Sequence, residues 1–312
     1  MTVHDDARDP SGLGRRAVLT GAAASVAVAA CQPSHEPEPT TKITMSEPRM
    51  PTIYLPHGGG PCFFMTWTMG PPDTWERMAA WLQGLPQGLP RAPTALVVIS
   101  AHWEEARPTV TTAETPPLLF DYYGFPPHTY ELTWPAPGSP ALAERVQELL
   151  GAAGIETATD PGRGYDHGVF VPLKLSFPRA DVPTVALSLR RGLDPAEHLA
   201  IGRALAPLRD EGVLLVGSGM SYHNMRRFMS PGAAAPSQRF DDWLAETVAL
   251  AEAERSERLT RWTTAPDARE CHPREEHLLP LMVVAGAAGS DAGARVFRDE
   301  VMGATVSAVR FG

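Results

Sequence analysis

Three histidines of this sequence each follow a short apolar run that is typical of a strand. They are His57 in LPHGGGPC, His102 in VVISAHWEE and His223 in GSGMSYHN. In a parallel or mixed sheet the carboxyl ends of strands lie along one edge, where open α/β sheets bind their ligands. A single histidine beside a strand is usually a hydrogen-bonding loop residue, but three together predict a shared site. The pattern therefore predicts a metal centre at the edge of the sheet.

Two further histidines lie in segments with several polar neighbours. His167 occurs in GYDHGVF, and His277 occurs in HPREEHLLPL at the start of an expected helix. Imidazole is a good ligand for zinc, iron, copper and nickel, and a catalytic metal site keeps one coordination position open for substrate. These five histidines are the candidate site residues. The three glycines after His57 are expected to leave room beside the metal for substrate.

The HGGG segment also permits two other interpretations. It is the oxyanion-hole motif of some esterases, which need a G-x-S-x-G nucleophile elbow. The nearest segment here is Gly219-Met-Ser221-Tyr-His223, in which histidine replaces the last glycine. A phosphate-binding loop would need G-x-x-x-x-G-K-[ST] or G-x-G-x-x-G after the first strand, and neither occurs there. An α/β hydrolase that uses Ser221 stays open as an alternative, as does a noncatalytic zinc-binding surface protein.

The elements that must position these residues alternate between strands and helices. The hydrophobic pattern predicts strands over residues 52–55, 95–100, 109–113, 183–189 and 213–217 and a terminal pair between 294 and 311. It predicts helices over 74–85, 140–152, 169–176, 195–208, 238–253 and 276–286. This alternation indicates a single layered α/β domain over residues 51–312. The proline-rich loop 114–137 is long for a connection, and long loops are often functional.

The N-terminal segment has the features of an export signal. Arg15 and Arg16 precede an alanine-rich apolar run that ends in Val28-Ala-Ala-Cys31, which resembles a lipobox. We therefore expect residues 1–31 to be a twin-arginine signal and residues 32–50 to be a polar tether. Any membrane association would occur through a lipid on Cys31. The alternative is a cytoplasmic protein whose translation starts at Met45 or Met50.

The composition is that of a globular protein with no basic face. Hydrophobic residues make up 43% and charged residues 20% of the 312 residues, and the net charge is -9. Nucleic-acid binding draws on clustered positive charge, so a nucleic-acid partner is not expected.

Several blocks of the chain together resemble one family, the class III extradiol ring-cleaving dioxygenases, in their DOPA 4,5-dioxygenase-like branch. The blocks run in order from Met50 to Gly312: HGGGP, SAHWE, ETPP, DYYGFP, GYDHGVFVPL, SGMSYHNMR and EEHLLPLMVVAGA. The resemblance implies a single α/β domain around a central mixed sheet flanked by helices. It also implies an enzyme that opens the ring of a small catechol-type aromatic with O₂ and gives a semialdehyde.

The resemblance assigns a role to each candidate residue. It implies one divalent metal, Fe²⁺ or Zn²⁺, held by His57, His102 and His277. Fe²⁺ is expected for oxygen chemistry, and Zn²⁺ is known in this branch. His223 would be the catalytic base and then acid, because imidazole titrates near working pH. His167 would contact substrate or oxygen, with Asp166 as its orienting partner, and Asn224 and Tyr123 would bind substrate.

Two departures from the family pattern are visible. The family commonly has HGSP where this chain has HGGGP, which is one residue longer. Many class III enzymes use glutamate as the third ligand, and Glu275 and Glu276 are adjacent to His277. Neighbouring residues on a helix do not share a face, so the expected helix over 276–286 favours His277 as the ligand.

Overall fold

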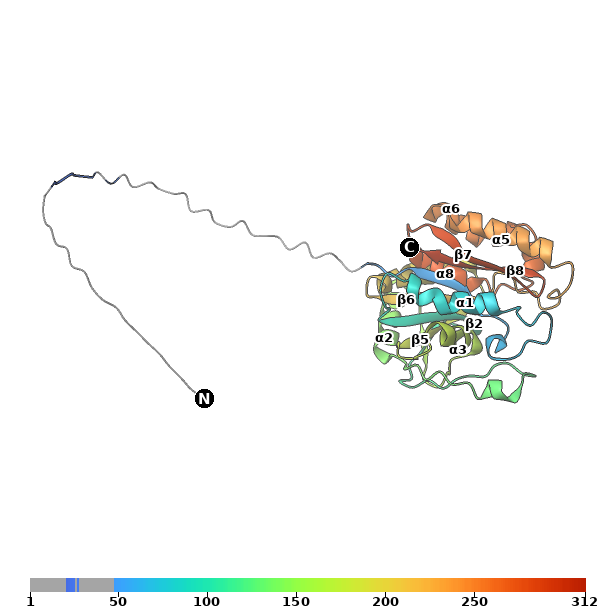
Figure 1. Ribbon diagram of the computed structural model, residues 1–312. Helices are drawn as coiled ribbons and strands as arrows, with labels where there is room; N and C mark the ends of the chain where they lie inside the picture. The colour runs from blue at the N-terminus through green and yellow to red at the C-terminus, as the bar shows by residue number, and fades with distance from the viewer. Residues whose placement is uncertain (1–20, 26, 28–47) are drawn as a thin grey trace, which may run out of the picture. The chain divides into compact units, whose positions relative to one another are not determined.

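The computed structural model describes residues 21–25, 27 and 48–312 (Figure 1). Contacts divide the chain into two units, Met1–Met45 and Ser46–Gly312. The expected signal 1–31 and tether 32–50 lie almost entirely outside the described residues, so both stay predictions. Met50, at the end of that tether, belongs to the fold: it is fully buried and its N–H donates to the carbonyl of Arg209. None of the helices among the described residues is long and apolar enough to cross a membrane.

Within residues 48–312, eight strands form one mixed sheet in the order β4-β3-β5-β2-β6-β1-β8-β7. The pairs β1/β6, β6/β2, β2/β5 and β3/β4 are parallel, whereas β1/β8, β7/β8 and β3/β5 are antiparallel. The strands are β1 (Thr52–Pro56), β2 (Ala95–Glu105), β3 (Thr109–Thr111), β4 (Ala158–Asp160), β5 (Thr184–Arg190), β6 (Val213–Gly219), β7 (Gly293–Val301) and β8 (Ala304–Phe311).

Helices cover both faces of this sheet. α3 packs with α1 and contacts β2 and β6, while α8 contacts β6, β1 and β2 from the opposite face and packs closely against α4. Figure 1 shows α5 and α6 beside β7 and β8, and α3 beside β5 and β2. The helices are α1 (Glu76–Gly84), α2 (Pro140–Ala152), α3 (His167–Ser176), α4 (Pro195–Leu205), α5 (Ala234–Val248), α6 (Glu252–Thr260), α7 (Ala268–Cys271) and α8 (Leu279–Ala288).

The four central strands are parallel and buried on both faces. Every residue of β1 and β6 is buried, as expected for apolar runs that are covered by helices on both sides. α8 is buried along its whole length and fills the space behind these strands. The carboxyl ends of β1, β2 and β6 therefore meet at one edge, which confirms the predicted α/β class with its central mixed sheet.

Helix ends with clear capping residues were predicted best. α2 has the predicted bounds because Ser139 accepts a hydrogen bond from the N–H of Leu142 and Pro140 occupies the first turn. The single helix predicted over 238–253 is wrong, since α5 ends at Val248 and α6 begins at Glu252. This break lets the buried Arg255 donate to the carbonyls of Gly289 and Asp291 beyond the end of α8. A tertiary contact of this kind leaves no local pattern.

Candidate active site

His57 follows β1 as predicted, and the loop after it holds its ring in place. Its N–H donates to the carbonyl of Gly219 at 3.1 Å, which continues the β1/β6 ladder by one residue. Its Nδ1 lies 2.9 Å from the carbonyl oxygen of Gly58, so Nδ1 is the donor and Nε2 keeps a free lone pair. The buried imidazole is therefore oriented as a metal ligand would be.

Two of the three glycines in this loop, Gly58 and Gly60, are required by the backbone and by its packing. Gly58 and Gly60 have φ values of +87° and +56°, which L side chains rarely adopt. A Cβ on Gly58 would also lie 2.6 Å from the Sγ of Cys62, and one on Gly60 would lie 3.0 Å from the ring of Phe125. All three glycines line the cavity, as expected, and Gly58 and Gly60 also let the loop turn tightly between its neighbours.

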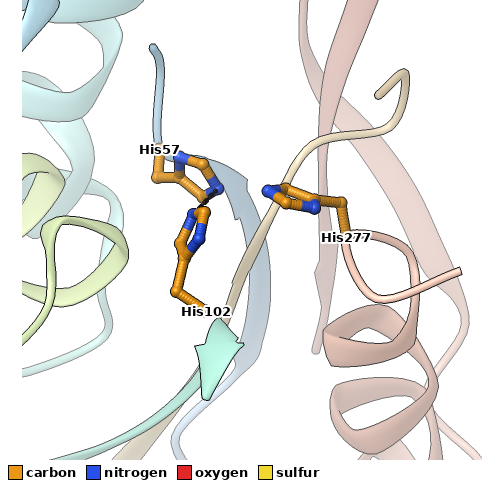
Figure 2. A group of neighbouring side chains, drawn as sticks. All are labelled: His57, His102 and His277. Carbon is orange, nitrogen blue, oxygen red and sulfur yellow. Dashed lines mark hydrogen bonds between the residues drawn. The ribbon is translucent and has the colours of Figure 1, made fainter. Parts of the chain in front are cut away.

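His102 was predicted to follow the second strand, but it lies within that strand. β2 continues to Glu105, and its pairing with β5 shifts register between Ile99 and Glu104. The irregular stretch that contains His102 brings its Nε2 to 3.2 Å from the Nε2 of His57 (Figure 2). A break in strand pairing next to an active site is a recurrent way to redirect a side chain.

His277 reaches the same point from the segment before α8. Its carbonyl accepts hydrogen bonds from the hydroxyl of Tyr54 at 2.6 Å and from the N–H of Met220 at 3.1 Å. Gly219 permits this approach, because a Cβ there would lie 2.1 Å from the His277 carbonyl oxygen. The buried Nε2 of His277 has no hydrogen-bond partner among the described residues. A buried imidazole nitrogen without a hydrogen-bond partner is a candidate metal ligand, because buried polar atoms are otherwise paired.

The three side chains offer nitrogen atoms that lie within 4.8 Å of one another (Figure 2). Burial, followed by the neighbouring imidazoles, lowers the pKa of His57 and of His277 well below the usual value. Burial, with His167 as the next cause, also lowers the pKa of His102. All three rings are therefore neutral at pH 7, which is the form that binds a metal. The residues fit one divalent ion with three imidazole ligands.

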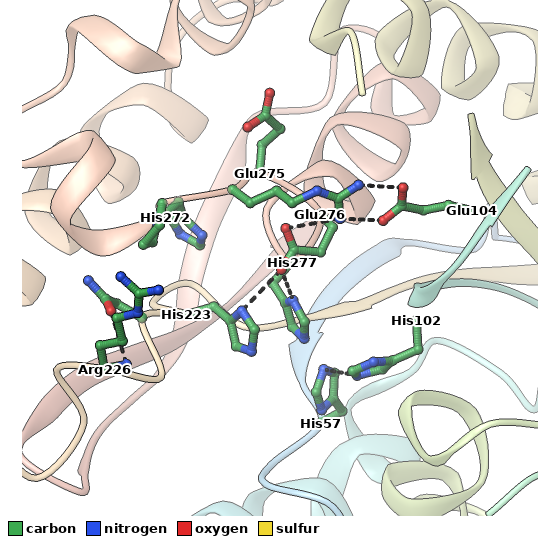
Figure 3. A network of polar contacts seen from close by, with 12 residues as sticks. His57, His102, Glu104, His223, Arg226, His272, Glu275, Glu276 and His277 are labelled. Carbon is green, nitrogen blue, oxygen red and sulfur yellow. Dashed lines mark hydrogen bonds and ion pairs between the residues drawn. The ribbon is translucent and has the colours of Figure 1, made fainter. Parts of the chain in front are cut away.

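His223 lies against His277 and shares a carboxylate with it. The two rings stack with their centroids 3.3 Å apart and their planes 16° apart. Glu276 Oε1 lies 2.9 Å from Nδ1 of His277 and 3.2 Å from Nδ1 of His223 (Figure 3). Burial alone would raise the pKa of Glu276, but its hydrogen bond with His223 lowers it on balance. One ionised oxygen therefore holds both imidazoles by the same ring nitrogen.

The sequence-based choice of His277 over Glu276 assumed a helix that begins at Glu276, and the structure has no helix at that residue. α8 starts at Leu279, and Glu276 lies in the turn before it. Glu275 points away and pairs with Arg269 at 2.6 Å. His277 belongs to the group of three histidines, whereas Glu276 lies in a second possible metal-binding group with His223 and His277. His277 as the third ligand therefore stays a prediction, and the helix on which it was based is absent.

His167 is the first residue of α3, and its orienting partner is Asp121, not the predicted Asp166. Asp121 Oδ1 accepts from the N–H of His167 at 2.9 Å and lies 2.8 Å from its Nδ1. Asp166 is fully buried and instead accepts from Ser100 Oγ at 2.7 Å and from Arg163 at 3.0 Å. The centroid of the His167 ring lies 4.0 Å from that of His102. Asp121 comes from the long loop 114–137, which therefore contributes directly to the site.

Of the two other residues predicted to bind substrate, Tyr123 lines the cavity and Asn224 does not. Asn224 is buried with its amide used by the backbone: Nδ2 donates to the carbonyl of Glu270 at 2.7 Å and Oδ1 accepts from the N–H of Arg226. It does not line the cavity, so its structural role is to hold the turn after His223. Tyr123 lines the cavity at its rim, where 91% of its surface is exposed.

A cavity of about 440 Å³ adjoins the histidines. All five site histidines line it, whereas His128, His198 and His272 do not. Its other walls are glycine, aromatic, methionine and acidic residues: Gly58, Gly59, Gly60, Trp67, Met69, Trp75, Asp121, Tyr122, Tyr123, Phe125, Met220, Met225, Phe228 and Met302. This volume accommodates a small aromatic molecule.

Ser221 is not placed as a nucleophile. It is buried outside the cavity, and its Oγ accepts from the N–H of Ser307 at 2.8 Å. His272 contacts the main-chain carbonyl of Ser221 and not its hydroxyl. The N–H of Gly59, which an oxyanion hole would use, donates to Cys62 Sγ. The alternative of an α/β hydrolase therefore lacks both of its catalytic parts.

Comparison with known proteins agrees with this geometry. Residues 52–312 match the family described as the catalytic LigB subunit of aromatic ring-opening dioxygenase. The chain is 38% identical over 274 residues to the dioxygenase tasH of Hapsidospora irregularis, which covers 82% of this chain and 83% of that protein. It is 37% identical over 248 residues to a 4,5-DOPA dioxygenase extradiol of Escherichia coli, covering 78% and 88% of the two chains.

Similar relatives occur in plants and among solved structures. A 4,5-DOPA dioxygenase extradiol of Beta vulgaris is 42% identical over 220 residues, covering 70% of this chain and 81% of the relative. The crystal structure of an uncharacterized protein of Escherichia coli K12 superposes with a TM-score of 0.68 and 32% identity, covering 85% of this chain and all of the other.

The fold, the histidine cluster and the family match define an oxidoreductase of the extradiol ring-cleaving type. The relatives define the branch more narrowly: this chain belongs to the class III extradiol dioxygenases, in their DOPA 4,5-dioxygenase-like group.

Proposed function

We propose that this protein is a metal-dependent extradiol dioxygenase that opens the ring of a small catechol with O₂. The observation that carries the proposal is that five histidines line one cavity, and that three of them turn neutral nitrogens toward one point. The net reaction adds both atoms of O₂ across the ring bond beside the diol and gives an aldehyde and a carboxylate.

His57, His102 and His277 would hold the metal. We infer Fe²⁺ for oxygen chemistry, because a redox-active ion that binds catechol and O₂ together supplies a route for electrons between them. A three-histidine site also suits Zn²⁺. The partners of the Nδ1 atoms fix two of the ligands: Gly58 holds His57, and Glu276 holds His277.

The remaining two histidines would move protons. His223 lines the cavity with its Nδ1 beside Glu276, so its Nε2 is the atom that can accept a proton from a catechol hydroxyl. The imidazolium that forms is stabilised by the carboxylate, and it returns the proton later in the reaction. His167, held at Nδ1 by Asp121, presents its other ring nitrogen to the cavity for a substrate or oxygen atom.

The test is reconstitution of activity. The purified chain is loaded with Fe²⁺ without oxygen and then given O₂ and a panel of catechols. We expect oxygen uptake together with a yellow ring-cleavage product. His57→Ala and His277→Ala should lose both metal and activity, whereas His128→Ala, which changes an exposed histidine outside the cavity, should lose neither. Stoichiometric iron with no oxygen uptake for any catechol would refute the proposal.

A further inference from the structure

The cavity beside the histidines contains no side chain that could pair with an anionic substituent. None of the residues that line it, all of them in the described part of the chain, is lysine or arginine. Asp121 is its one carboxylate, and that group is held by His167. Away from the histidines the wall consists mainly of methionine and aromatic side chains. A charged group on the substrate would lose water there without gaining a partner.

Two arginines on segments that flank the site have carboxylate partners, and the exposed Arg226, three residues after His223, does not line the cavity. Arg163 donates to Asp166 at 3.0 Å, and Arg274 donates to Glu104 at 2.6 Å. Neither of them lines the cavity. Moving either guanidinium group to a substrate would leave an acid without its partner, and Asp166 is fully buried.

A second, outer groove continues from the cavity. It has a volume of about 960 Å³ and shares Met69 and Met302 with the inner cavity. Its charged residues are three acids, Asp73, Asp299 and Glu300, and two arginines, Arg77 and Arg298. Both arginines lie within ion-pair distance of acids: Arg77 of Asp299 at 2.6 Å, and Arg298 of Asp241 at 3.3 Å. The groove therefore offers space to a substituent but no net positive charge.

Exposed apolar side chains surround these two spaces. Among the described residues five large hydrophobic side chains are exposed, and four of them line the cavity or the groove: Met69, Tyr123, Met225 and Met229. Exposed apolar groups gathered at one place usually mark a binding surface. Methionine also adapts its shape to irregular apolar ligands.

We propose that the substrate is a catechol whose ring carries an uncharged, apolar substituent that passes between Met69 and Met302 toward the outer groove. This inference rests on the proposed function, since it places the diol at the histidines. It distinguishes the chain from relatives named for DOPA, which carries both an ammonium and a carboxylate.

Three catechols of nearly equal size test this inference. They are 4-propylcatechol, its cationic counterpart dopamine, and its anionic counterpart 3-(3,4-dihydroxyphenyl)propionate. Binding is measured by calorimetry on the full chain loaded with redox-inert Zn²⁺, and kcat/KM is measured on the Fe²⁺-loaded chain. We expect 4-propylcatechol to bind at least tenfold more tightly than either charged analogue. Each methylene added to the alkyl chain should raise affinity up to about fourfold.

A second experiment places a positive charge at the boundary between the cavity and the outer groove. Met69→Arg should improve the affinity for the propionate relative to 4-propylcatechol by about tenfold, because it supplies the missing cation. Val296→Arg adds the same charge at an exposed position that lines neither space and should leave the ratio unchanged.

The outcomes separate the two proposals. Equal or tighter binding of the propionate or of dopamine by the unaltered chain overturns the inference about the substituent, whether or not the ring is opened. Preferential binding of 4-propylcatechol without turnover of any catechol supports that inference and counts against the proposed dioxygenase activity.

Discussion

Replacing Glu276 by glutamine should weaken metal binding although Glu276 is not itself a ligand. Its Oε1 lies 2.9 Å from Nδ1 of His277 and 3.2 Å from Nδ1 of His223. Glutamine keeps the size of the side chain but removes the charge, so the hydrogen bond that orients His277 becomes weaker. Loss of such an outer carboxylate typically costs about 10-fold to 100-fold in metal affinity, or about 1.4 to 2.7 kcal/mol.

The assay is competition for Zn²⁺ between the protein and a coloured chelator at pH 7.5. Glu275→Gln is the matched control, because Glu275 is adjacent in sequence but pairs with Arg269 away from the histidines. We expect Glu276→Gln to raise the Kd for zinc at least tenfold and Glu275→Gln to change it less than twofold. Equal Kd values for the two variants would refute the orienting role of Glu276.

Three further predictions follow from other contacts. Asp121→Asn should lower kcat about 10-fold to 100-fold and alter the pH profile of kcat. Zinc affinity should change little, because Asp121 orients His167, which is not a predicted metal ligand. An unchanged pH profile would contradict this. Burial lowers the pKa of His272 from 6.5 to about 4, so the metal-free chain should lose about 3 kcal/mol of unfolding free energy from this residue between pH 7 and pH 4. Stability falls as the pH falls because the unfolded chain binds the proton at a higher pH than the folded chain does. Denaturant titrations should therefore show an unfolding free energy that depends less on pH for His272→Gln, but not for the exposed His128→Gln. Gly219→Ala should lose zinc binding and stability together, because its Cβ would lie 2.1 Å from the His277 carbonyl oxygen; a stable variant with normal zinc affinity would show that this close approach is not needed.

The sheet and most of its helices could be predicted because the local signals were strong. Buried runs such as β1 and β6 are continuous and apolar, and Ser139 and Asp194 cap their helices through their own side chains. β4 was missed because an edge strand of three residues is too short to show alternation. The start of α8 was predicted three residues early, since Glu276 and His277 are compatible with a helix and only tertiary contacts hold them in a turn.

His57, His102 and His223 could be found from sequence because each lies at or beside the carboxyl end of a strand, and these ends meet at one edge of the sheet. Their partners could not. Asp121 reaches His167 from a loop 46 residues earlier, and no period links the two. Asp166 is adjacent to His167 in sequence, but its carboxylate binds Ser100 and Arg163 instead. Adjacency in sequence was therefore a poor guide to hydrogen bonding, whereas the acidic residue in DYYGFP was a signal that could have been used.

The origin of the ligands has a consequence for the unfolding of the chain. Tyr54 and His277, which meet at the site, are 223 residues apart, and His57 directly follows the end of β1, the strand that contains Tyr54. An ion bound to His57 and His277 would close most of the domain into one loop, as a long-range covalent crosslink does. Loss of the metal should then remove this crosslink, so that the first and last parts of the domain separate more readily. Protease resistance of the folded domain would in this way report the occupancy of its metal site.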